Sequence, residues 1–80
     1  MTGEEWSPRL ADLHAEVQRS RTSVAEARRA GRTMRELECA QVDLLAALQR
    51  LDDGLKAAGT TLPQHLRHEL ELLRLLVGRG

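Results

Sequence analysis

The chain has 80 residues and a formal charge of zero, from twelve acidic and twelve basic side chains. A chain of this length folds as one domain with a small core, and its balanced charge argues against a generally basic nucleic-acid-binding protein. There are fifteen Leu and ten Ala residues but no Ile, Phe or Tyr, so β-strands are disfavoured. The composition therefore predicts an all-α fold.

Cysteine content and hydropathy bear on the compartment. The single cysteine, Cys39, excludes a disulfide within one chain, which favours the cytoplasm. Residues 1–7 are acidic and lack an apolar run, so we expect a flexible leader rather than a secretion signal. No segment approaches the roughly 18–20 apolar residues of a membrane span. We therefore expect a cytoplasmic protein without a membrane partner.

The first expected helix spans about residues 8–30. Ser7 followed by Pro8 is typical of a helix start, because the serine oxygen can cap N–H groups and proline suits the first turn. The apolar row of this segment is thin, since two of its places hold small side chains. Gly31 is typical of a left-handed helix end. One long helix through Gly31 is an alternative, because a glycine within a helix costs only about 1 kcal/mol.

The second expected helix spans about residues 34–58 and lies at the centre of the predicted bundle. Thr33 and Glu36 have the spacing of a capping box. Apolar residues recur at alternating spacings of three and four over about seven turns, with Gln41 as the polar member that can fix the packing register. Leu45 lies on one flank of this row. Small residues that allow close helix approach lie on the other flank, at Ala40, Ala47 and Gly54.

The third expected helix spans about residues 62–77. Thr61 and Gln64 have the spacing of a second capping box, and Pro63 suits the first turn. Apolar side chains cover most of its circumference, a wider face than a surface helix of a monomer needs. We expect one row to anchor the core, namely Leu66, Leu70, Leu73 and Val77. We expect a second row to reach another chain, namely Leu72, Leu75 and Leu76.

Arginines concentrate around the first turn, at Arg28, Arg29, Arg32 and Arg35. Guanidinium groups can hold phosphate through two hydrogen bonds, so a phosphate- or nucleic-acid-binding regulatory protein is an alternative function. The simpler interpretation is that these charges pair with acidic residues across the hairpin, such as Glu36 and Glu38. No aromatic residue lies among the arginines to stack on bases, so a nucleic-acid partner is the less favoured interpretation.

Candidate chemical groups are few. His65 and His68 have a spacing that can place two imidazoles on one metal ion, but no further ligand has a recognisable spacing to them. Arg35 could stabilise a thiolate at Cys39, although a small side chain at a secondary helix contact is the simpler interpretation. No nucleophile is paired with a base. We therefore expect no metal, no cofactor and no enzymatic activity.

The sequence as a whole predicts a small antiparallel three-helix bundle, a single domain over residues 8–78 that dimerises through helix packing. The predicted function is a non-enzymatic protein–protein interaction module, such as an adaptor, docking or regulatory protein. Its surface would comprise the leucine-rich third helix and Leu45, and its partner would be a second copy, another helical protein, or both. Whether the first helix packs in its own chain or swaps into a second chain is left open.

Overall fold

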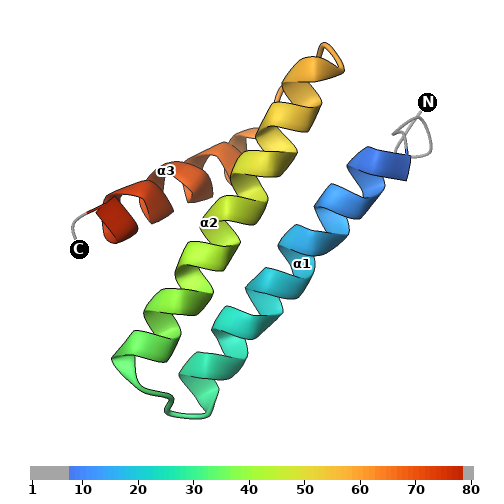
Figure 1. Cartoon of the computed structure of the whole chain (residues 1–80). Helices are drawn as coiled ribbons and strands as arrows, with labels where there is room; N and C mark the ends of the chain where they lie inside the picture. Colours follow the sequence, from blue (N-terminus) through green and yellow to red (C-terminus); the bar gives the residue numbers. More distant parts are fainter. Residues whose placement is uncertain (1–7, 79–80) are drawn as a thin grey trace.

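The computed structural model describes residues 8–78, which form three α-helices. Helix α1 spans Pro8–Arg29, α2 spans Met34–Ala57 and α3 spans Gln64–Gly78. Helices α1 and α2 lie side by side and antiparallel, while α3 packs on the other side of α2 and leaves it at an angle (Figure 1). The prediction of an all-α bundle of three helices is confirmed. The expected flexible leader lies outside the described residues.

Local signals build the turn between α1 and α2. Gly31 has a φ of 66°, in the left-handed region that favours glycine. The Thr33 hydroxyl accepts a hydrogen bond from the Glu36 N–H at 3.2 Å, and the Glu36 carboxylate accepts one from the Thr33 N–H at 3.3 Å. The predicted turn and capping box are confirmed, so one long helix through Gly31 is wrong. Gly59, after α2, has a φ of 83° and ends that helix in the same way.

The start of α3 differs from the prediction. The helix begins at Gln64, and the carbonyl of Pro63 accepts the N–H of Arg67 at 2.9 Å, which places Pro63 at the N-cap. Thr61 lies too early in the chain to cap this helix, so the second predicted capping box is wrong. The predicted box requires a helical Leu62, and the helical conformation is disfavoured for a residue directly before proline; Leu62 lies outside the helix, with its side chain buried in the core.

The core lies along α2, between α1 and α3, and every buried residue is apolar in the described part of the chain. Its α2 members are Leu44, Ala47, Leu48, Leu51 and Leu55. Helix α1 contributes Leu10, Val17, Val24 and Ala27. The chain around and within α3 contributes Leu62, Leu66, Leu70 and Leu73. The one polar member of the α2 row, Gln41, is half-buried.

The small-residue flank of α2 receives α1 of the same chain. A Cβ added at Gly54 would lie 2.8 Å from Cδ1 of Leu13 and 3.1 Å from Cδ2 of Leu10. Ala47, two turns earlier, is fully buried. The missing side chain at Gly54 therefore allows a close approach of the two helices, as the spacing of small residues indicated.

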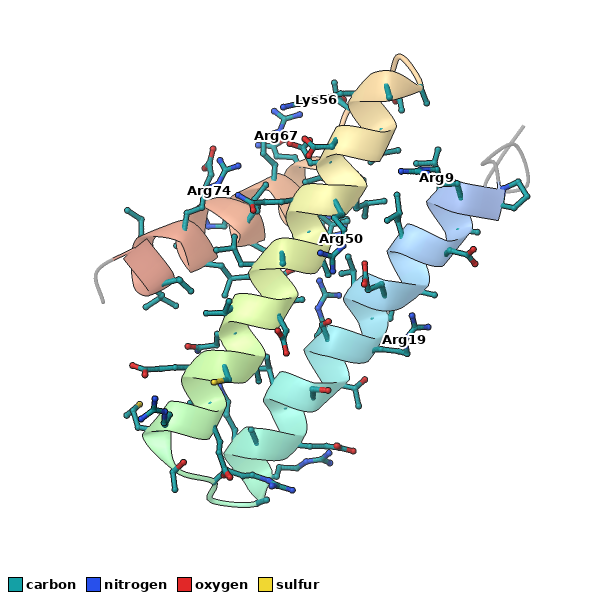
Figure 2. All side chains as sticks on the ribbon, viewed as in Figure 1. Arg9, Arg19, Arg50, Lys56, Arg67 and Arg74 are labelled. Atoms are coloured by element: carbon teal, nitrogen blue, oxygen red, sulfur yellow. The ribbon has the colours of Figure 1, made fainter. Side chains whose placement is uncertain are left out.

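Two ion pairs join α1 to its neighbours. The Arg50 guanidinium donates to both carboxylate oxygens of Glu16, at 3.0 and 2.8 Å, and Figure 2 shows Arg50 between α2 and α1. These hydrogen bonds lower the pKa of Glu16 and raise the pKa of Arg50. Arg21 pairs with Glu69 and so links α1 to α3, although each of these two helices packs mainly against α2.

Among residues 8–78, no helix combines the length and apolar character needed to cross a bilayer.

Candidate interaction surface

Helix α3 carries two leucine rows that differ in exposure. The row expected to anchor the core is buried at Leu66, Leu70 and Leu73. Val77 of the same row is half-buried, and Leu45 of α2 is partly buried against the core. The outer row stays exposed, at 48% for Leu72, 65% for Leu75 and 57% for Leu76. The chain's own core thus takes up the first row, and contact of the outer row with another chain stays a prediction.

The apolar row of α2 becomes more exposed toward the turn with α1. Leu48 and Leu51 are fully buried, whereas Leu37 is only partly buried and Met34 is 70% exposed. Figure 1 gives the reason, because α3 starts near the end of α2 and diverges from it before reaching the turn. Val42, on the neighbouring edge of α2, is also exposed at 45%.

Two adjoining apolar clefts lie beside the end of α3, and both are lined by Gln41 and Leu76. The larger, of about 400 Å³, lies between the turn-proximal half of α2 and the end of α3, and includes Met34 and Val42. The smaller, of about 290 Å³, lies between all three helices and includes Leu72. We call the two clefts together the notch, and the exposed row Leu72, Leu75 and Leu76 the ridge.

The charges at the edge of the notch are balanced. Arg28 of α1 borders the smaller cleft, and Glu38 of α2 borders the larger one. Neither makes an ion pair with a described residue. Arg21 and Glu69, which also line the smaller cleft, are paired with each other. The notch therefore has apolar walls, one amide at Gln41, and one unpaired charge of each sign.

The arginines of the turn are unpaired. All four members of the cluster are exposed, namely Arg28, Arg29, Arg32 and Arg35. The ion pairs in the described part of the chain involve other basic residues, and Glu36 is engaged in capping α2. Pairing across the hairpin is therefore the wrong interpretation of this cluster. Its four guanidinium groups are exposed, and residues 26–38, which also hold three glutamates, carry a net charge of +1.

The remaining candidates lie apart from one another. His65 and His68 are exposed on α3, and Cys39 is exposed on α2 beside Val42, so no helix contact buries it. In the region that the structure describes, no three His, Cys, Asp or Glu side chains are grouped so that they could hold a metal ion.

Met34 and Val42 are surface residues that sequence reasoning missed. Met34 is the first residue of the apolar row of α2, and a row with these spacings is expected to pack along its whole length. Its position in the first turn of α2 was the available signal, because a shorter third helix cannot cover the whole of a longer one.

Comparison of this protein with protein-family models, curated proteins and solved structures finds no match.

Proposed function

We propose that this protein is a non-enzymatic protein–protein interaction module that acts through the ridge of α3 and the adjoining notch. The observation that carries the proposal is the exposure of Leu72, Leu75 and Leu76 beside two apolar clefts. Contiguous apolar surface on a small protein is typical of an interaction site. An adaptor, docking or regulatory role fits such a surface.

A helix is the kind of partner that suits this surface. The ridge residues are spaced at i, i+3 and i+4, so they form one apolar stripe that can pack into the groove of a facing helix pair. The notch offers a groove of the complementary kind, and Gln41 within it can both donate and accept a hydrogen bond, which fixes the register of packing. Self-association is part of the proposal, because a second copy carries the same ridge and notch.

The test is the oligomeric state in sedimentation velocity at micromolar concentration. We expect a wild-type dimer and a monomeric Leu72→Glu/Leu76→Glu variant, because the interface would bury two unpaired carboxylates. Helical circular dichroism should persist, since about half of each leucine is already exposed. Gln18→Glu/Gln49→Glu is the matched control, because it adds the same charge at exposed positions of α1 and α2.

Two results would contradict the proposal as it concerns self-association. One is a monodisperse wild-type monomer, and the other is a dimer that survives both carboxylates. Loss of helical structure in the leucine variant, with the control still folded, would instead assign Leu72 and Leu76 to the core of the chain.

A second candidate is a phosphate- or nucleic-acid-binding regulatory protein. It is supported by the four exposed arginines at the turn, which have no acidic partner among the described residues. Guanidinium groups without partners can bind phosphate through charge-assisted hydrogen bonds. This candidate uses the turn and leaves the ridge unexplained, so it ranks second.

A further inference from the structure

We propose that the ridge of one copy packs into the notch of a second copy and that the second copy does the same in return. The dimer is then closed by two identical ridge-in-notch contacts. This inference rests on the proposed function, because it names the partner and the packing mode of the same surface.

The two complementary shapes lie next to each other on one chain. Leu72 and Leu76 line the notch, while Leu75 lines neither cleft and is 65% exposed. A two-fold rotation brings each ridge to the other notch, so that one type of contact covers all of the exposed leucines. Because Leu75 lines neither cleft, a single helix that only fills the notch does not account for its exposure.

The lengths of the helices indicate what is missing from the notch. Helix α2 has 24 residues and is about 36 Å long, whereas α3 has 15 residues and is about 22 Å long. One α3 therefore covers only part of α2, and the exposed Met34 lies where that cover ends. The α3 of a second copy would complete the cover, so that each α2 packs against α1 and two copies of α3, as in a four-helix arrangement.

Charge favours a second copy over a strongly acidic or basic partner. The notch carries one unpaired charge of each sign, at Arg28 and Glu38, and the whole chain has a formal charge of zero. Two copies therefore do not repel each other at long range. Each copy presents to the other a notch that carries one unpaired positive and one unpaired negative charge.

Two single variants test the reciprocal packing. Met34→Lys places a charge in the notch, and Leu75→Glu places the opposite charge on the ridge. Each side chain is at least 65% exposed, so helical circular dichroism should be unchanged. Each variant alone should weaken the dimer by about tenfold or more, because both of its contacts then set a charge against apolar side chains.

The mixture of the two variants is the decisive experiment. In a mixed pair, one contact is native, and the other sets the new lysine of one copy against the new glutamate of its partner. Native mass spectrometry of an equimolar mixture should therefore show a heterodimer at a concentration where each variant alone is monomeric. Gln49→Lys mixed with Gln18→Glu is the matched control, which should show the wild-type dimer alone and in mixture.

The outcomes separate this inference from the proposed function. A Met34→Lys variant that stays dimeric, or a mixture that stays monomeric, overturns the ridge-in-notch contact while self-association stands. A wild-type monomer overturns this inference and the self-association part of the proposed function, and leaves docking of another helical protein to be tested. If Met34→Lys loses helical structure, Val42→Lys in the same cleft replaces it, with the same expected results.

Discussion

Glu16 of α1 and Arg50 of α2 form an exposed ion pair with two hydrogen bonds. Hydrogen bonding to Arg50 lowers the pKa of Glu16 below its ordinary value of 4.5, so the folded state favours the ionised carboxylate. A lowered pKa in the folded state adds stability at neutral pH, and this stability is lost as the pH falls through the folded-state pKa. The contribution is small, because both groups are in contact with water.

Glu16→Gln should therefore lower the urea midpoint of unfolding slightly at neutral pH and have no effect at about pH 2, where wild-type Glu16 is itself protonated. Glu26→Gln is the control, because Glu26 is exposed on the same helix and makes no ion pair with a described residue. An effect of Glu16→Gln that is equal at both pH values would show that the amide disturbs packing and that the ion pair is not the cause.

The turn at Gly31 distinguishes the helical hairpin from the alternative in which one long helix runs through Gly31. Gly31 has a φ of 66°, and a Cβ added there meets nothing within 4 Å, so a substitution changes only the backbone energy. Gly31→Ala should destabilise the protein by about 1 kcal/mol, because the left-handed conformation is costly for residues with a Cβ. In one long helix, the same change would stabilise by about 1 kcal/mol.

Urea unfolding followed by circular dichroism measures the sign of this effect. Gly59→Ala is a parallel case, since Gly59 has a φ of 83° and equally open surroundings, and it should destabilise by a similar amount. An increase in the free energy of unfolding for Gly31→Ala alone would contradict the turn.

The elements differ in how well they could be predicted. The end of α1 and the start of α2 depend on local signals, namely Gly31 and the Thr33–Glu36 capping box, so the pattern of residues was enough to place them. The start of α3 was placed two residues too early, because two local signals conflict there: the Thr61–Gln64 spacing favours a cap, whereas Pro63 disfavours a helical Leu62. The direction of α3 could not be predicted, because spacing along one helix does not determine its crossing angle with another.

At the scale of the whole molecule, the kind of candidate surface was predictable but its extent was not. The apolar excess of α3 pointed to an exposed leucine row, and the structure leaves Leu72, Leu75 and Leu76 exposed. The contribution of Met34 and Val42 depends on where α3 leaves α2. The notch therefore follows from the relative placement of three helices, which no single motif encodes.

The charges of the molecule sum to zero but are distributed unevenly over its surface. Glu16 and Glu69 neutralise Arg50 and Arg21 along the helices, whereas the arginines of the turn have no acidic partner among residues 8–78. Residues 26–38 hold the four arginines and three glutamates, so the net charge at this end of the molecule is +1, while the formal charge of the chain is zero. If the second candidate function is correct, binding of a polyanion should depend on this end.

A fluorescent DNA duplex at low salt is a suitable probe of this charge. Four phosphate contacts would give a slope of log K against log salt of about −3.6, and Arg29→Gln/Arg32→Gln/Arg35→Gln should reduce it to about −0.9. The matched control removes three exposed arginines elsewhere, Arg9→Gln/Arg19→Gln/Arg74→Gln (Figure 2), and should retain the steep slope. Arg28 is kept in both variants because it borders the notch. Equal losses in both variants would indicate non-specific attraction, and undetectable binding of the wild-type protein at low salt would exclude the anion-binding function.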